Sequence, residues 1–170
     1  LIAKFSKMFD SIYLKLDYGL KGLSHVDIFR HLDTAENLLS KSKVKFRNSS
    51  VTSGREGYYL TDHFFKHKDE FGAKSLVDYF KKAITFHSQF FKHQIGPERL
   101  IRHQRPDGVT ILFDAGSNEL MIATKESIET FFRPENGLET FFDYVRRSDG
   151  VEVADLLRSR YQGAISQRMP

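Results

Sequence analysis

Two short stretches of the chain contain the residue types that could cleave a phosphodiester bond. Lys66 and His67 stand in "FFKHKDEFG", and Thr130 and Arg133 stand in "ETFFRP". RNA supplies its own nucleophile, the 2′-hydroxyl, so its cleavage needs a proton acceptor, a proton donor and groups that stabilise charge on the phosphate. A histidine beside a lysine on a helix, facing a strand with a threonine and an arginine, would meet these needs.

A second histidine on the same predicted helix raises the alternative of a metal site. His63 and His67 are four positions apart, so a helix would place both rings on one face, and Glu70 could supply a third ligand. No glutamate follows His63 where a metalloprotease has its base, and Lys66 would place a positive charge beside the cation. His67 could also be an ordinary surface or core histidine, and the residues alone leave these alternatives open.

Composition excludes several other classes of site. The chain has no cysteine, which rules out a thiol nucleophile and a disulfide framework, and it has neither a GxSxG elbow nor a phosphate-binding glycine loop. The formal net charge is +4, and basic residues gather between positions 63 and 105, which suits a polyanionic partner as well as it suits solvated helix faces. No apolar run is long enough for a membrane span, so we expect no stable membrane insertion.

Hydrophobic periodicity predicts an α+β fold in which N-terminal helices precede a small antiparallel sheet. We expect a helix over residues 2–12 and another over 24–41 that opens with Ser24 and Asp27 in a capping-box pattern. A third helix should be capped by Thr61 or Asp62, run to about Glu70 and end at Gly72, and a fourth should begin at a Ser75 and Asp78 capping box and reach about residue 93. Residues 107–134 predict at least three short strands in a meander, with alternating Val109, Ile111 and Phe113, then Leu120 and Ile122, then Ile128, Thr130 and Phe132. Short helices follow in "LETFFDYVRR" and "VEVADLLRSRY", before a loose tail.

The polar stretch 42–57 is the most linker-like part of the chain. We therefore predict an N-terminal helical segment over residues 1–55 and a second unit over residues 56–170. The first segment interleaves charges with apolar residues and lacks the pattern of a signal peptide. Because the chain begins with Leu1, we expect a piece of a longer polypeptide or an engineered fragment.

The stretches "HFFKHKDEFGAKSLVDYFKKAITF" and "RPDGVTILFDAGSNELMIATKESIETFFRPENG" carry a family resemblance. Together they resemble the C-terminal tRNA nuclease domains of contact-dependent growth inhibition toxins of bacteria, which are similar to the nuclease domain of colicin D. The resemblance covers about residues 60–146 and implies the barnase–EndoU–colicin–RelE-like fold. It also implies an endoribonuclease without metal or cofactor that cuts tRNA in or near the anticodon loop and leaves a cyclic phosphate.

The resemblance also implies roles for single residues. His67 matches the catalytic histidine and Lys66 the lysine before it, while Thr130, Phe132 and Arg133 match a hydroxyl residue, an aromatic residue and a lysine at the last strand. His67 would be the general acid or base, Lys66 and Arg133 would stabilise phosphate charge, Thr130 would donate a hydrogen bond and Phe132 would stack on a base. The chain departs from the family pattern at Lys68, where relatives have glycine, and at "KES", where they have a "DG" turn. Further contacts to the tRNA are expected from Lys68, Lys81, Lys82, Arg102, His103 and Arg105.

Partners and location are implied in the same way. The resemblance implies an acidic immunity protein in the producing cell, delivery to the cell surface or medium, action in the cytoplasm of the target cell, and accessory or uptake proteins there. Residues 1–55 would belong to an uptake module or pack as helices on the nuclease. Two other functions stay open: a non-catalytic RNA-binding or protein-interaction module of a bacterial surface or phage protein, and a zinc hydrolase that uses His63 and His67.

Overall fold

The fold is known from a computed structural model, which describes residues 24–48, 55–92 and 99–166 and shows the predicted α+β class. The predicted helix over residues 2–12 lies outside the described residues. Along the chain the elements are α2 (His25–Lys41), β1 (Lys45–Phe46), α3 (Glu56–Phe71), α4 (Leu76–Phe91), β2 (Leu100–Gln104), β3 (Thr110–Asp114), β4 (Glu119–Ala123), β5 (Ser127–Phe132), α5 (Leu138–Asp149) and α6 (Val151–Ser166).

Two helices begin at serine caps that the sequence predicts. The Ser24 hydroxyl accepts a hydrogen bond from the backbone N–H of Asp27 at 3.2 Å, and Ser75 accepts one from Asp78 at 3.1 Å. Each bond satisfies a backbone donor that the first turn of a helix leaves without a partner. The starts of α2 and α4 are therefore encoded locally.

Helix α3 begins earlier than predicted. It starts at Glu56 without a side-chain cap, so the prediction that Thr61 or Asp62 caps it is wrong. The Thr61 hydroxyl instead donates to the carbonyl oxygen of Gly57 at 2.7 Å. Threonines inside helices commonly make this bond to the residue four positions earlier. The predicted end is confirmed, because Gly72 adopts the left-handed conformation (φ 58°) that closes a helix. The additional turn brings Tyr59 onto the same helix as His67.

The sheet is mixed, and the prediction of a purely antiparallel sheet is wrong. Its strand order is β1-β5-β4-β3-β2, and the run from β2 to β5 is an antiparallel meander that includes the three predicted strands. β1 lies at the other edge and pairs with β5 in parallel, with Lys45 opposite Ser127 and Phe46 opposite Ile128. This pairing is possible because the chain passes through two helices before it returns to the sheet.

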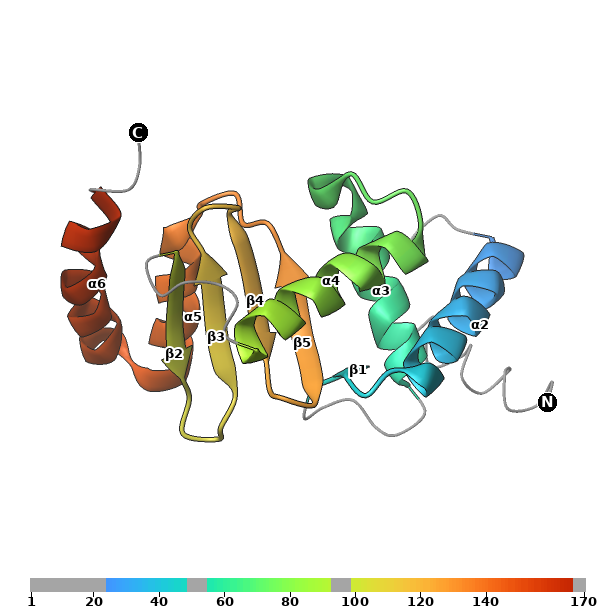
Figure 1. The fold of residues 1–170 in the computed structure, drawn as a ribbon, viewed down its shortest axis with the longest axis horizontal. Helices are drawn as coiled ribbons and strands as arrows, with labels where there is room; N and C mark the ends of the chain where they lie inside the picture. The colour runs from blue at the N-terminus through green and yellow to red at the C-terminus, as the bar shows by residue number, and fades with distance from the viewer. Residues whose placement is uncertain (1–23, 49–54, 93–98, 167–170) are drawn as a thin grey trace.

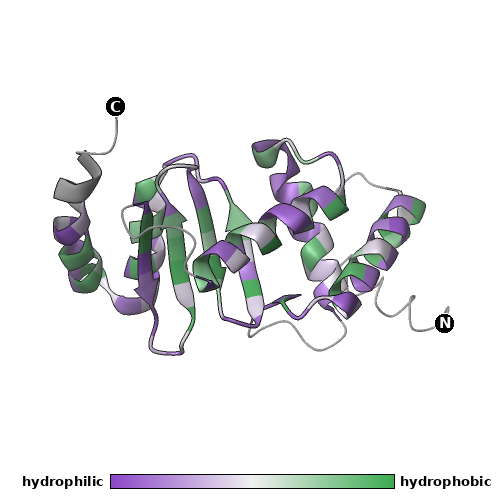
Figure 2. Ribbon diagram, viewed as in Figure 1, coloured by the Kyte–Doolittle hydropathy of each residue, from purple (hydrophilic) through white to green (hydrophobic). Residues whose placement is uncertain are grey.

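Hydrophobic clusters cover both faces of the sheet. The first core joins α2, α3 and α4 to one face and includes Phe46, Tyr79 and Phe131, while the second joins α5 and α6 to the other face and includes Phe113 and Phe142. Figure 1 shows α4 in front of the strands, with α2 and α3 to the right and α5 and α6 to the left. In Figure 2 the central strands are mainly hydrophobic and the helices alternate in colour, as expected for elements with one buried side.

The described part of segment 1–55 packs against the rest of the chain. Ala35 and Leu39 of α2 and Phe46 of β1 belong to the first core, together with residues of α3, α4 and β5. This packing fits the alternative in which the N-terminal helices lie on the second unit, and the division at residue 55 stays a prediction. Within the described ranges, no helix combines the length and the apolar character needed to cross a membrane.

Candidate active site

An open cavity of about 510 Å³ lies where α3, β5 and α5 meet. Four of the predicted site residues, Lys66, His67, Thr130 and Phe132, line it together. The complete lining is Asn48, Tyr59, Asp62, His63, Lys66, His67, Ile122, Glu129, Thr130, Phe132 and Tyr144. Helix α3 and strand β5, which lie more than fifty positions apart in the chain, thus form one polar and aromatic site.

Helix α3 contributes to the cavity through two rows of side chains. Tyr59, His63 and His67 form an aromatic row with a spacing of four, in which the ring centroids are 4.3 Å and 5.9 Å apart. Beside it lies a charged row in which Lys66 Nζ is 3.1 Å from Asp62 Oδ2. Residues four apart on a helix lie next to one another, so the helix itself sets both rows.

His67 is held on two sides. Its Nδ1 lies 2.9 Å from Glu70 Oε1, and its ring stacks on Phe132 with centroids 5.3 Å apart and planes at 27°. A carboxylate oxygen only accepts hydrogen bonds, so Nδ1 carries the hydrogen and Nε2 of the neutral ring is the proton acceptor. The side chain is 18% exposed, which leaves this ring accessible from the cavity that it lines.

Glu70 links His67 to the end of strand β5. Its Oε2 accepts a hydrogen bond of 2.8 Å from the backbone N–H of Arg133, and Arg133 Nη1 donates to the Glu70 carbonyl oxygen at 3.2 Å. The Arg133 guanidinium lies 5.1 Å from the centre of the Phe71 ring and 3.8 Å from Glu119 Oε2. Arg133 is not among the residues that line the cavity, and its bonds to Glu70 link it indirectly to His67.

A register shift in β5 sets which side chains face the cavity. Thr130 lies opposite Ile122, but Ala123 lies opposite Ile128, so Glu129 is an extra residue between the two pairs. Thr130 and Phe132 line the cavity as predicted, while Ile128 packs in the first core. The prediction that Ile128 shares their face is therefore wrong, because a bulge interrupts the alternation of a strand.

Two tyrosines and an asparagine complete the wall. The Tyr59 hydroxyl donates to the Glu129 carbonyl oxygen at 2.5 Å and accepts from Asn48 Nδ2 at 3.1 Å. Burial, and then the charge of the Glu129 carboxylate, raise the pKa of Tyr59 well above its usual range. Burial also raises the pKa of Tyr144. Both phenols therefore stay protonated near neutral pH and can donate hydrogen bonds.

The other predicted contact residues are dispersed over the surface. Lys68 lies over the rings of Phe64 and Phe65, at 6.0 and 5.4 Å, rather than at the cavity. Lys81 and Lys82 are exposed on α4, where Lys82 Nζ is 3.8 Å from Asp78 Oδ1. Arg102 is exposed on the edge strand β2. None of these four residues is among those that line the cavity in the described part of the chain.

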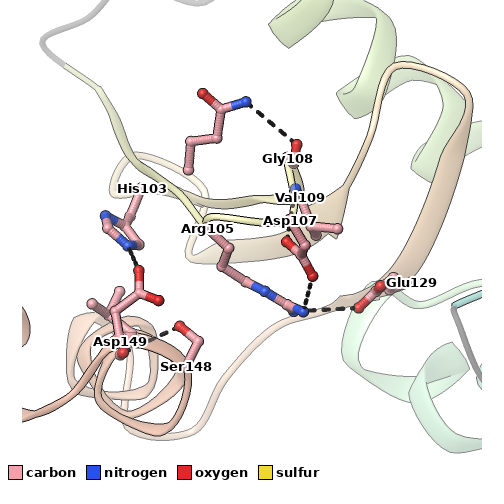
Figure 3. Close-up of polar contacts among 10 residues, drawn as sticks. His103, Arg105, Asp107, Gly108, Val109, Glu129, Ser148 and Asp149 are labelled. Carbon is pink, nitrogen blue, oxygen red and sulfur yellow. Dashed lines mark hydrogen bonds and ion pairs between the residues drawn. The ribbon is translucent and has the colours of Figure 1, made fainter.

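The end of β2 and the turn that follows it contact α5 and one residue of the cavity wall. His103 Nε2 bonds to the Asp149 carboxylate at the end of α5, whereas Arg105 extends to Asp107 and to Glu129, whose Oε2 is 3.8 Å from Arg105 Nη1 (Figure 3). Burial raises the pKa of Glu129, and the charge of Arg105 opposes that rise. Of the predicted cationic residues outside α3, Arg105 is therefore the one whose described contacts include a cavity-lining side chain.

Sequence reasoning did not find Tyr59, Asp62, Glu129, Tyr144 or Asn48. The first two could have been found, because they stand four positions before His63 and Lys66 on the same helix. The other three come from a bulge, from another helix and from the end of β1, so no local pattern marks them. In the parts of the chain that the structure describes, no group of three or more acidic or histidine side chains is placed to hold a metal ion.

No protein-family model matches the chain, and no curated protein is similar to it in sequence. The function must therefore be argued from the site itself.

Proposed function

We propose that the protein is a metal-independent endoribonuclease that cleaves RNA through attack of the 2′-hydroxyl on the adjacent phosphate. One observation carries the proposal: Lys66, His67, Thr130 and Phe132 line a single cavity, and His67 has its Nδ1 bonded to a carboxylate. A ring fixed in this way can exchange a proton at Nε2, which is the atom that general acid–base catalysis requires.

Each wall of the cavity has a task in this reaction. His67 transfers a proton at Nε2, Lys66 stabilises the negative charge of the phosphorane, and the Thr130 hydroxyl donates a hydrogen bond to a phosphate oxygen. Phe132 offers a ring on which a base can stack next to His67. The pairing of Lys66 with Asp62 orients the ammonium group in the protein without RNA.

Arg133 has a different role in the proposal from the one that the resemblance implies. Its backbone N–H and guanidinium both bind Glu70, which in turn binds His67. Arg133 is therefore a positioning residue that ties α3 to β5, and Lys66 is the cation that meets the phosphate. A lysine at position 133 would keep the backbone bond, but it would lose the directed contact of the guanidinium.

The resemblance of residues 60–146 extends the proposal to substrate and context. The substrate would be tRNA, cut in or near the anticodon loop to leave a cyclic phosphate. The protein would be a toxin of interbacterial competition that acts in the cytoplasm of a target cell, and an acidic immunity protein would neutralise it. The net charge of +4 agrees with both polyanionic partners.

The test is incubation of the purified chain with total tRNA in EDTA. We expect cleavage by the wild-type chain and a loss of about 10²–10⁴-fold with His67→Ala, as is typical of a lost proton-transfer group. The control is His31→Gln, since His31 lies on α2 and bonds to the Asp27 carbonyl oxygen of its own helix. Circular dichroism verifies that all variants fold.

Several outcomes would contradict the proposal. Intact tRNA with the wild-type chain would overturn the enzymatic function, and tight binding without cleavage would favour a non-catalytic RNA-binding module. Cleavage that EDTA abolishes would favour a metal enzyme. Equal cleavage by His67→Ala would remove His67 from the mechanism.

A further inference from the structure

Glu129 lines the same cavity as His67, but it has no role in the reaction described so far. It is the extra residue of the bulge in β5, between Ile128 in the first core and Thr130 in the cavity wall. Its side chain is 18% exposed, so the carboxyl group is partly shielded from water and still open to a ligand. Bulges commonly redirect a side chain beside an active site.

We propose that Glu129 is the general base of the ribonuclease and that His67 is its general acid. This inference rests on the proposed function. Glu129 takes the proton of the 2′-hydroxyl, the 2′-oxygen forms a bond to phosphorus, and the bond from phosphorus to the 5′-oxygen breaks. The imidazolium of His67 gives its proton to that 5′-oxygen, so the products are a 2′,3′-cyclic phosphate and a 5′-hydroxyl.

The two groups have surroundings that suit these opposite tasks. The Glu70 carboxylate holds Nδ1 of His67, so Nε2 is the ring atom that can give a proton to the leaving 5′-oxygen. Burial raises the pKa of Glu129 and makes its carboxylate a better proton acceptor. Two titratable groups in one cavity with different environments are the usual arrangement for acid–base catalysis.

Cationic groups reach Glu129 from two elements. Arg105, from the turn between β2 and β3, lies 3.8 Å away, and its charge opposes the rise that burial causes in the pKa of Glu129, while Lys66 and the two histidines of α3 line the same cavity. Arg47, which follows β1, pairs with Glu56 at 3.8 Å instead. The contact with Arg105 is longer than a hydrogen bond, so the Glu129 oxygen stays available to accept a proton from the substrate.

Acidic and phenolic groups also face Glu129. Asp107 of the same turn raises the pKa of Glu129, and Tyr59 and Tyr144 border the cavity beside it. Asp62 is the other carboxylate in the wall, but its Oδ2 binds Lys66 at 3.1 Å, and accepting a proton there would break that ion pair. Glu129 is therefore the carboxylate better placed to accept a proton.

The first experiment is the pH dependence of kcat/KM for a short RNA substrate, for the wild-type chain, Glu129→Gln and Glu126→Gln. Glu126 is an exposed carboxylate in the turn before β5 and serves as the matched control. We expect a bell-shaped profile for the wild-type chain and the control. In Glu129→Gln, kcat/KM should be about 10²–10⁴-fold lower, and the fall in kcat/KM on the acidic side of the profile, the acid limb, should disappear.

The second experiment separates base from acid. A dinucleotide analogue with 4-nitrophenolate in place of the 5′-nucleoside has a leaving group that needs no proton. On this substrate we expect His67→Ala to recover most of its lost activity, because its missing acid is no longer needed. Glu129→Gln should stay slow, because the 2′-hydroxyl still needs a base.

Each other result overturns a stated part of the inference. Recovery of Glu129→Gln but not of His67→Ala would exchange the two roles, and equal rates for Glu129→Gln and Glu126→Gln would exclude Glu129. Loss of the acid limb in His63→Gln but not in Glu129→Gln would make His63 the base. A wild-type chain that cleaves no RNA overturns the proposed function itself, so the two failures are distinguishable.

Discussion

Lys66 and Lys68 are two positions apart on α3, yet their ammonium groups have different surroundings. Lys66 lines the cavity and pairs with Asp62, whereas Lys68 lies over the rings of Phe64 and Phe65. A helix turns by about 200° over two residues, so neighbouring lysines of this kind cannot serve the same site. The pair is a natural comparison of a proposed active-site cation with a surface one.

Replacement of Lys66 by methionine should lower kcat/KM for RNA cleavage by about 10–100-fold, because the variant loses the charge that stabilises the phosphorane. Lys68→Met should stay within about twofold of the wild-type chain, since its charge lies away from the cavity. Steady-state cleavage assays at fixed ionic strength measure both effects. Equal losses in the two variants would mean that only general attraction of RNA is involved.

At the residue scale, site residues that follow a regular helix or strand pattern are predictable from the sequence. A residue that an irregularity of the strand brings into the site is not. Lys66 and His67 stand out because they are adjacent on one predicted helix, and Thr130 and Phe132 because they alternate on one predicted strand. Glu129 is hidden by the bulge, since a strict alternation would turn it away from Thr130.

Among the elements, those with a clear hydrophobic pattern in the sequence were predicted. Strands that exist only because they pair with another strand were not. β3 and β4 are mostly buried strands with apolar runs, Ile111 to Phe113 and Leu120 to Ala123, whereas β2 contains Arg102, His103 and Gln104 because it is an edge strand with one exposed side. β1 has two residues, and it is a strand only because β5 accepts it in parallel. No hydrophobic pattern can reveal such a strand before its partner is in place.

Helix α6 offers a test of how an element is fixed to the sheet. Leu157 is 7% exposed and belongs to the second core, while its neighbour Leu156 is 63% exposed. Leu157→Ala should lower the free energy of unfolding by about 2–3 kcal/mol, through lost burial and a cavity at the edge of the core. Leu156→Ala should change it by less than about 0.5 kcal/mol. Urea unfolding of both variants measures the difference, and similar values would mean that α6 contributes little to the second core.

On the scale of the whole molecule, the site depends on how the first core packs against one face of the sheet. Tyr79 of α4 donates a buried hydrogen bond of 2.6 Å to the Phe131 carbonyl oxygen. In the sequence, Phe131 stands between Thr130 and Phe132, which both line the cavity. Phe71, next to Glu70, stacks on Phe131 with centroids 4.6 Å apart. The first core therefore sets the distance between α3 and β5, and hence the width of the cavity.

A buried histidine in α4 makes the free energy of unfolding depend on pH. His87 of α4 is 4% exposed, and its Nε2 bonds to the Thr124 carbonyl oxygen at 2.8 Å. Burial lowers the pKa of His87 below its usual value of 6.5, against the opposing effect of that bond. Below about pH 6.5 the unfolded chain therefore binds a proton that the folded chain does not, so the free energy of unfolding falls as the pH falls.

His87→Gln keeps a donor for Thr124 and removes the titration, so it isolates this effect. At pH 8 the variant and the wild-type chain should have similar unfolding profiles in urea, because His87 is then neutral in both states. Between pH 6.5 and pH 5 the wild-type chain should lose stability faster, with a difference in slope of at most about 1.4 kcal/mol per pH unit. Parallel curves would mean that the folded protein accepts the charge on α4. An RNA cleavage profile measured over the same range must therefore be corrected for the fraction folded before its acid limb is assigned to Glu129.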